Sequence, residues 1–354
     1  SMLLTLLFIA IVVSYIGTYS VEKFFLKYSL FIDTPSDKSI HKNPTPTAGG
    51  ISILLSYFLY IFMLLVFHEL FIPWYDGHPE YDENPFFILM VSLFPLIIIG
   101  LIDDFNGVNI GIRLFTQFFS AVIIIYFFQV SNTTIDFREF TNQTTLLIII
   151  VSIIMSMWLT NLYNFMDGID GYASLECIFV SFSAAFLAYM NKPESLVSFY
   201  ILGLGLANIG FLIRNWSPAK IFMGDTGSIS LGFILAFLIF FSASESVLSI
   251  YTWLILLSVF IADASYTIIV RIVTKKNIFQ AHLRHAFHIV TINNNSHTHT
   301  NKALIAINII WVLPFAIMSN IYIEYNVILT IAVYIPFIFY LINIGAGLEK
   351  SENL

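Results

Sequence analysis

The sequence has almost no cysteine and little charge. Cys177 is the single cysteine in 354 residues, which excludes an intrachain disulfide and argues against a cysteine-ligated metal site. Charged residues make up 10% of the chain, whereas a soluble domain has about 25%. With 58% hydrophobic and 17% aromatic residues, the composition excludes an ordinary soluble protein and indicates an integral membrane protein.

Long apolar runs take the place of the missing charge. Runs of about 17–23 residues are long enough to cross a bilayer as helices, and they do not alternate as barrel strands would. They lie near 2–21, 48–67, 86–102, 113–130, 144–160, 174–190, 197–213, 227–243, 248–270, 303–320 and 327–346. The predicted fold is an all-α polytopic membrane protein with about 11 transmembrane helices, forming a single domain over residues 1–354.

Basic residues are sorted between the two sides of this predicted bundle. Of the 15 Lys and Arg residues, all but Arg138 and Lys192 fall in loops on one side. Since Lys and Arg are enriched in cytoplasmic loops, the N-terminus is expected outside and the C-terminus in the cytoplasm. The polar clusters then all face the cytoplasm, in loops at about 22–47, 103–112, 161–173, 214–226 and 271–302.

The stretch from Asn161 to Gly171 places amides, carboxylates and glycines between two apolar runs. Polar groups there are costly unless they face water or a ligand. Four of them recur every three residues and would form one stripe on a helix: Asn161, Asn164, Asp167 and Asp170. This pattern favours binding of a nucleotide diphosphate and a divalent cation over a polar hinge.

Two further acidic clusters lie at the ends of apolar runs. Asp103 and Asp104 are adjacent, so they repel each other unless a cation or proton intervenes. They could bind Mg²⁺, or one could act as a base on a phosphate oxygen; a solvated helix end is the structural alternative. Asp225 lies at the start of the eighth run, where Thr226 or Ser228 is expected to cap a helix whose N-terminus suits an anion.

A histidine cluster follows the ninth run. His282, His285 and His288 are spaced to lie on one side of a helical turn, with Arg284 among them. Zinc is one candidate ligand, but no Glu or Cys completes a familiar ligand set. A loop that binds pyrophosphate is therefore the favoured interpretation.

Other features are open to more than one interpretation. Asp263 lies inside the ninth run and is either functional or a structural partner for a polar group on a neighbouring helix. Lys42 could contact a phosphate or a base oxygen, or simply hold the topology. Gly49 and Gly50 would allow close backbone packing, and His297 is expected in a solvated loop.

In order, these motifs resemble the polyprenyl-phosphate N-acetylaminosugar-1-phosphate transferase superfamily, which is glycosyltransferase 4-type. It includes transferases that initiate O-antigen and enterobacterial common antigen, and phospho-MurNAc-pentapeptide transferase. The resemblance covers residues 33 to 288. It rests on His41-Lys42 with Pro46 to Gly50, Asp103-Asp104, Asn161 to Gly171, Phe222 to Ser228, and His282 to His285.

The resemblance implies roles for twelve residues. Asn164 and Asp225 would hold Mg²⁺, with Mn²⁺ able to take its place. The catalytic carboxylates would be those of Asp103, Asp104 and Asp167, the first two acting on the polyprenyl phosphate. Substrate-binding residues would be Lys42, Asn161, Asp170 on the uracil edge, Phe222 stacked on the base, and His282, Arg284 and His285 on the diphosphate.

The chain also departs from the family pattern. The common third acid after the Asp pair is Gly107 here. Arg284 replaces a histidine of many enterobacterial relatives, and His288 replaces a glutamine found in others. These differences point toward the O-antigen branch and leave the donor sugar open.

The expected reaction is transfer of an N-acetylaminosugar-1-phosphate from a UDP-sugar to polyprenyl (undecaprenyl) phosphate, with release of UMP. It would take place on the cytoplasmic face of a bacterial inner membrane and initiate O-antigen, lipopolysaccharide or other cell-envelope glycan synthesis. No nucleic-acid partner is expected, and a homodimer stays open.

Two other functions fit the sequence less well. The alternative from another class is a proton- or cation-coupled secondary transporter that uses Asp103, Asp167 and Asp263. It fits less well, because the acids concentrate at one face and no internal repeat is visible. A catalytically inert scaffold fits less well too, because every acidic cluster is retained.

Overall fold

The computed structural model describes residues 2–34, 43–67, 85–131, 143–278 and 282–349. His41 and Lys42 lie outside these residues. Within them the regular secondary structure is helical except for one short antiparallel pair, β1 (Ile32–Asp33) and β2 (Thr45–Pro46), and turns and loops connect these elements. The prediction of an all-α membrane protein is confirmed.

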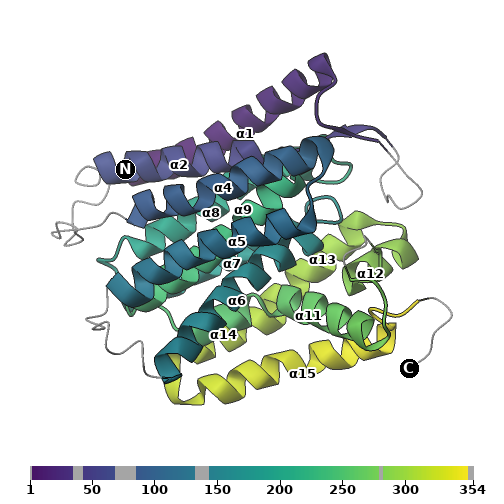
Figure 1. The fold of residues 1–354 in the computed structure, drawn as a ribbon. Helices are drawn as coiled ribbons and strands as arrows, with labels where there is room; N and C mark the ends of the chain where they lie inside the picture. Colours follow the sequence, from purple (N-terminus) through teal and green to yellow (C-terminus); the bar gives the residue numbers. More distant parts are fainter. Residues whose placement is uncertain (1, 35–42, 68–84, 132–142, 279–281, 350–354) are drawn as a thin grey trace.

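Figure 1 shows the long helices lying side by side, with their ends gathered at two opposite sides of the molecule. In chain order the helices are α1 (Met2–Tyr28), α2 (Gly50–Val66), α4 (Pro85–Asn106), α5 (Ile110–Ile125), η1 (Tyr126–Ser131), α6 (Gln143–Met166), α7 (Tyr172–Asn191), α8 (Val197–Asn215), α9 (Gly224–Ser244), α10 (Ile250–Leu256), α11 (Ser258–Val273), α12 (Ala286–Asn294), α13 (His297–Ile307), η3 (Asn308–Val312), α14 (Leu313–Ile321), η4 (Ile323–Tyr325) and α15 (Asn326–Ile344).

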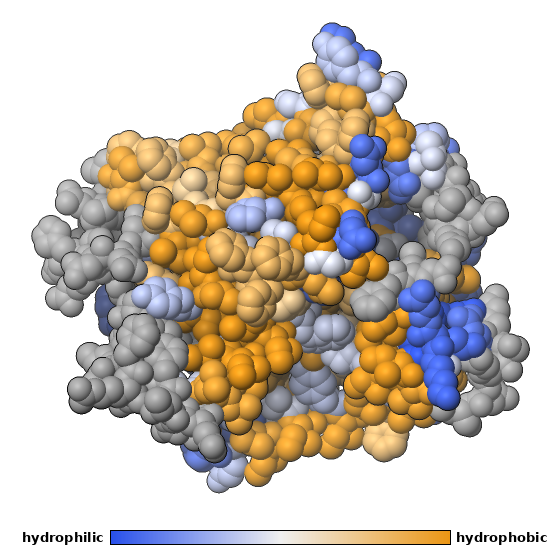
Figure 2. Space-filling model, in the orientation of Figure 1, coloured by the Kyte–Doolittle hydropathy of each residue, from blue (hydrophilic) through white to orange (hydrophobic). Residues whose placement is uncertain are grey.

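The described chain has 9 helices that are long and apolar enough to cross a membrane, or 10 if α10 and α11 count as one span. The apolar helix α2 is shorter, with 17 residues. Large apolar side chains are exposed along the bundle, as Phe115 and Ile328 illustrate. In Figure 2 hydrophobic residues cover the middle of the visible face and hydrophilic ones gather toward the right-hand end. An apolar outer surface of this kind is what helices in contact with lipid require.

The ninth apolar run is not one straight helix. It was predicted as a single span over 248–270, but α10 and α11 meet at Leu257 with an angle of 76° between them. Leu257 has φ −90° and ψ 7°, outside the helical range, and no proline or glycine marks the break. After the bend, α11 contacts the start of α12, where the N–H of Ala286 donates to Asp263.

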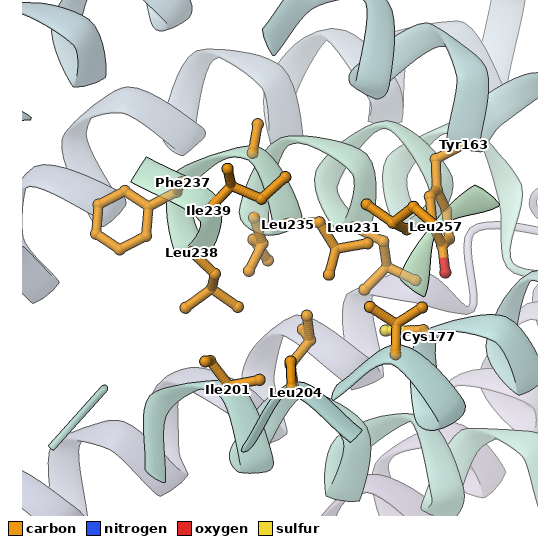
Figure 3. Packing of buried hydrophobic residues seen from close by; sticks show 14 of the residues in the cluster. Tyr163, Cys177, Ile201, Leu204, Leu231, Leu235, Phe237, Leu238, Ile239 and Leu257 are labelled. Carbon is orange, nitrogen blue, oxygen red and sulfur yellow. The ribbon is translucent and has the colours of Figure 1, made fainter. Parts of the chain in front are cut away.

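Helix α9 forms the centre of the bundle. Nearly all its residues are buried, as expected of a helix that is apolar on every side. Helices α2, α4 and α6 pack against it. Figure 3 shows its side chains meeting those of neighbouring helices: Leu231, Leu235, Phe237, Leu238 and Ile239 of α9 lie near Tyr163, Cys177, Ile201, Leu204 and Leu257.

The start of α2 is tied to the start of α9. The N–H groups of Gly49 and Gly50 donate to the carbonyls of Phe222 and Met223, at 2.9 Å each. A Cβ on Gly50 would lie 2.1 Å from the Cα of Gly227, so only glycine allows this approach. The close packing expected at this glycine pair is confirmed, and it places the loop before α9 at one end of the bundle.

Candidate active site

A cavity of about 1260 Å³ opens at the end of the bundle where α6 ends and α9 begins. Side chains from separate parts of the chain surround it. Ten of the twelve predicted site residues line it: Asp104, Asn161, Asn164, Asp167, Asp170, Phe222, Asp225, His282, Arg284 and His285. Asp103 lies beside it, as described below, and Lys42 lies outside the described residues.

The predicted helical stripe is only half correct. Asn161 and Asn164 lie on α6, but the helix ends at Met166, so Asp167 and Asp170 follow in a turn. Gly168 in this turn packs against α12, where a Cβ on this glycine would lie 2.3 Å from Nε2 of His288. The turn bends the two aspartates into the cavity instead of continuing along the helix.

Three helices bring oxygen ligands around one guanidinium. Nη1 of Arg113 lies 3.1 Å from Oδ2 of Asp103 and 3.6 Å from Oδ2 of Asp225. Arg113 also donates to Oδ1 of Asn164, whose Nδ2 donates to Oδ1 of Asp225 at 2.5 Å. Side chains that are far apart in sequence on α4, α6 and α9 therefore meet at one positive charge.

The same oxygens suit a magnesium ion. Carboxylate and amide oxygens are the ligands that Mg²⁺ prefers, and those of Asp103, Asn164 and Asp225 already surround the cationic group of Arg113. No cluster of three or more His, Cys, Asp or Glu suited to a metal exists in the described part of the chain. A bound ion would thus take its other ligands from phosphate oxygens and water, as Mg²⁺ commonly does.

Asp104 caps α9 from a different helix. Its Oδ1 accepts from the N–H of Asp225 at 2.8 Å, and its Oδ2 accepts from the N–H and Oγ1 of Thr226 at 3.0 and 2.6 Å. The expectation that Thr226 or Ser228 caps this helix is wrong. Thr226 donates to Asp104 and Ser228 donates to the Gly224 carbonyl, because the carboxylate satisfies the free N–H groups better than a hydroxyl.

Asn161 forms an amide pair between helices. Its Nδ2 donates to Oε1 of Gln117 at 2.5 Å and to the Met157 carbonyl at 2.8 Å, and its Oδ1 accepts from Nε2 of Gln117 at 3.2 Å. The pair joins α5 to α6 at the cavity wall.

Asp170 is held by His297, which the sequence did not assign to the site. Its Oδ2 lies 3.3 Å from Nδ1 of His297 and accepts from the N–H of Ala219 at 3.1 Å. Burial alone would raise the pKa of Asp170, but His297 and the Ala219 amide outweigh that effect and hold it below its usual range. His297 is the first residue of α13 and lines the cavity, so its placement in a solvated loop is wrong.

Asp167 faces other carboxylates across the cavity. Burial, followed by the negative charges of Asp225, Asp104 and Asp170, raises its pKa well above the usual range. A proton or a cation is therefore favoured near this side chain.

The histidine loop, residues 282–285, is compact but not helical, and His288 follows it on α12. Residues 282–285 precede α12, so the predicted helical turn is wrong, yet the ring centroids of His282 and His285 lie 5.1 Å apart and those of His285 and His288 6.0 Å apart. Burial, reinforced by the charge of His285, lowers the pKa of His282 to about 4 and that of His288 to about 3. At pH 7 these two side chains are neutral hydrogen-bonding groups.

The segment after α15 folds against this loop. Nη2 of Arg284 lies 3.0 Å from Oε2 of Glu349, and Nη1 of Arg271 lies 3.4 Å from Oε1 of the same carboxylate. The N–H of Gly347 donates to the Arg284 carbonyl at 2.9 Å. A single acid near the end of the chain gave no signal in the sequence, whereas the structure places it in the cavity wall.

Comparison with known proteins identifies the family of the chain. The model of the family described as "Glycosyl transferase family 4" matches residues 86–243, which include Asp103, Asn164 and Asp225. A phospho-N-acetylmuramoyl-pentapeptide-transferase of Staphylococcus epidermidis (strain ATCC 35984) is 30% identical over 257 residues, covering 68% of this chain and 74% of the relative. The chain belongs to glycosyl transferase family 4.

Other members of the family are similarly distant. A "Probable undecaprenyl-phosphate N-acetylglucosaminyl 1-phosphate transferase" of Bacillus subtilis (strain 168) is 26% identical over 73% of this chain and 68% of its own length. A phospho-N-acetylmuramoyl-pentapeptide-transferase of Prochlorococcus marinus (strain MIT 9312) is 27% identical over 69% of this chain and 68% of its own length. This family member is thus similar to transferases named for two different sugars, at comparable identity to each.

Proposed function

We propose that this protein transfers an N-acetylaminosugar-1-phosphate from a UDP-sugar to a polyprenyl phosphate, releasing UMP. The observation that carries the proposal is the meeting of Asp103, Asn164 and Asp225 around one cationic position, beside a wall of histidine and arginine side chains. Such a cavity suits a diphosphate, whose negative charge must be neutralised during transfer. The names of the relatives support the same reaction class.

The donor would lie along the cavity with its base at one end. Asp170 and Phe222 would hold the uracil, the first through a carboxylate that stays ionised because of His297. His282, Arg284 and His285 would bind the diphosphate from the opposite wall. Magnesium held by Asn164 and Asp225 would supply charge neutralisation at the phosphates.

The acceptor would enter from the membrane side. Apolar residues of the cavity wall, Ile110, Leu114, Trp158 and Ile268, suit a polyprenyl chain whose phosphate lies near Asp103 and Asp104. An oxygen of this phosphate would attack the β-phosphorus of the donor as UMP leaves. Because a phosphomonoester has a second pKa near 6, the acceptor is largely dianionic at pH 7, and a basic aspartate need contribute only modestly.

The setting of the reaction belongs to the same proposal. It would proceed at the cytoplasmic face of a bacterial inner membrane, and its product would start an O-antigen or another cell-envelope glycan. The transporter alternative has less support, because the acids of the site gather at one end of the bundle beside arginine and histidine side chains.

The test is UMP release by the purified protein in detergent with Mg²⁺, undecaprenyl phosphate and a panel of UDP-sugars. We expect one or two N-acetylaminosugar donors to yield UMP only when the lipid is present.

Asp225→Asn should lower the rate at least about 100-fold while the protein stays folded. The matched control is Glu194→Gln, which removes an exposed carboxylate between α7 and α8 and should leave the rate unchanged. Full turnover by Asp225→Asn would refute the metal site, and absence of UMP with every donor would refute the reaction.

A further inference from the structure

Asp263 is a buried carboxylate to which the proposed reaction assigns no role. It lies in α11, after the bend at Leu257, and is 5% exposed. An ionisable side chain inside a membrane helix is costly, so its partners indicate what it does.

One set of partners is the start of α12. Oδ1 of Asp263 accepts from the N–H of Ala286 at 2.9 Å, and Oδ2 accepts from the N–H of Phe287 at 3.2 Å. Oγ1 of Thr267, one turn further along α11, donates to Oδ1 at 3.1 Å. The carboxylate therefore anchors the end of the histidine loop to α11 across 23 residues of sequence.

The other partner is a histidine of the cavity. Nδ1 of His285 lies 3.4 Å from Oδ1 of Asp263, and His285 is only 2% exposed. Since Nδ1 faces the carboxylate, Nε2 is the nitrogen left for the cavity that His285 lines. The group bound by one ring nitrogen of a histidine determines the tautomer and the direction of the other.

The surroundings distinguish His285 from its neighbours. His282 and His288 flank it, and Phe165 and Phe287 stack near its ring at 6.4 and 5.8 Å between centroids. Two carboxylates contact the described part of this loop. Asp263 is paired with His285, whereas Glu349 is paired with Arg271 and Arg284.

We propose that Asp263 is a positioning residue for the transfer reaction, holding His285 with Nε2 directed at the donor diphosphate. The inference rests on the proposed function. A purely structural role, as an N-terminal cap of α12, is the competing explanation, and it predicts no dependence on His285.

A double-mutant cycle separates these explanations. UDP-sugar binding and kcat/KM are measured for wild type, Asp263→Asn, His285→Gln and the double variant. Each single change should weaken donor binding about 10-fold or more, and the double variant should be no weaker than His285→Gln within about 3-fold. If the two losses multiply instead, Asp263 does not act through His285 and the inference is overturned.

Uridine binding provides a second readout. Uridine lacks the phosphates, so its affinity, measured by displacement of labelled UDP-sugar, should be unchanged in Asp263→Asn. Equal loss of uridine and UDP-sugar affinity would indicate general disruption and contradict the inference.

The matched control is Glu176→Gln on α7. Glu176 is another buried carboxylate of the bundle, with Oε2 accepting from Nδ2 of Asn308 at 2.6 Å, and it contacts no histidine in the described residues. Donor affinity should be unchanged in this variant. An equal loss would show that removal of any buried carboxyl group weakens the site, and would overturn the inference.

If Asp263→Asn does not fold, Thr267→Val removes one bond to the same carboxylate while leaving its charge. Its loss of donor affinity, about 2- to 5-fold, should vanish in the His285→Gln background.

The activity of the wild type distinguishes the two proposals. Absence of UMP release with any donor refutes the reaction. An active wild type in which the losses of the two single variants multiply refutes only the role of Asp263.

Discussion

Asp103 and Asp104 are neighbours, but their oxygens bind different groups. Asp104 gives both oxygens to the start of α9, which holds Asp225 in place through its own backbone N–H. Asp103 accepts from the N–H of Val108 and pairs with Arg113, whose charge it shares with Asp225. Asp104 is therefore tied to the backbone of another helix, whereas Asp103 faces the cationic position where transfer would occur.

The same residues show what the sequence could and could not predict. Acidic and amide clusters between apolar runs are rare enough to be noticed, and most of those predicted reach the cavity. Arg113, His297 and Glu349 were not assigned to the site, because a lone charged residue near a helix end is an ordinary feature of membrane proteins. Only the packing of distant helices gives them partners.

His288 should make the protein less stable in mild acid. Its pKa is lowered to about 3 in the folded protein, whereas an unfolded chain has the ordinary value of 6.5. Below pH 6.5 the unfolded chain therefore binds a proton that the folded one does not, and stability falls as pH decreases toward 3, by up to about 1.4 kcal/mol per pH unit.

The measurement is the Tm of wild type and His288→Gln between pH 7.5 and 4.5. Wild type should lose more Tm across this range than the variant. Parallel pH dependence in the two proteins would mean that His288 is not buried in its neutral form.

At the scale of elements, the crossing of α2 and α9 positions the site. Both helices begin at the cavity end, and their glycines let the backbones touch where α9 presents Asp225. Apolar length predicted both helices, and Gly49-Gly50 predicted close backbone packing where α2 begins, but the partner helix α9 emerged only from the structure. The bend between α10 and α11 could not be predicted, since no proline or glycine lies near Leu257 to mark a break in the apolar run.

Gly227→Ala should destabilise the protein. The added methyl group would lie 2.3 Å from Cγ of Met223 and 2.8 Å from Cα of Gly50, so the helices must separate at a cost of about 1–3 kcal/mol. The matched control is Gly17→Ala in α1, where the nearest atom would be Cβ of Ser52 at 3.4 Å, an ordinary contact. Thermal unfolding in detergent measures both, and equal Tm values for the two variants would refute the close crossing.

At the scale of the whole molecule, the predicted site residues that the structure describes gather at one end of an apolar bundle. The distribution of Lys and Arg predicts that this end is cytoplasmic. Composition and run length were sufficient for the fold class, because lipid admits few solutions for a backbone. They were not sufficient for the sugar, since that choice depends on side chains that meet only in the folded cavity.

Orientation can be tested with single cysteines, because the native Cys177 is buried. Glu194→Cys, in the α7–α8 loop, should react with a membrane-impermeant maleimide in intact spheroplasts. Asn293→Cys, on the exposed side of α12, should react only after lysis. The opposite labelling pattern would place the cavity outside the cell.

The most direct measurement is a crystal structure of the protein with a UDP-sugar and Mn²⁺. The anomalous scattering of Mn²⁺ gives the position of the metal. We expect one peak between Asn164 and Asp225, with Arg113 displaced from it and the diphosphate facing Arg284 and His285. A peak on the histidines of the loop, or a nucleotide bound at the opposite end of the bundle, would contradict this assignment of the site.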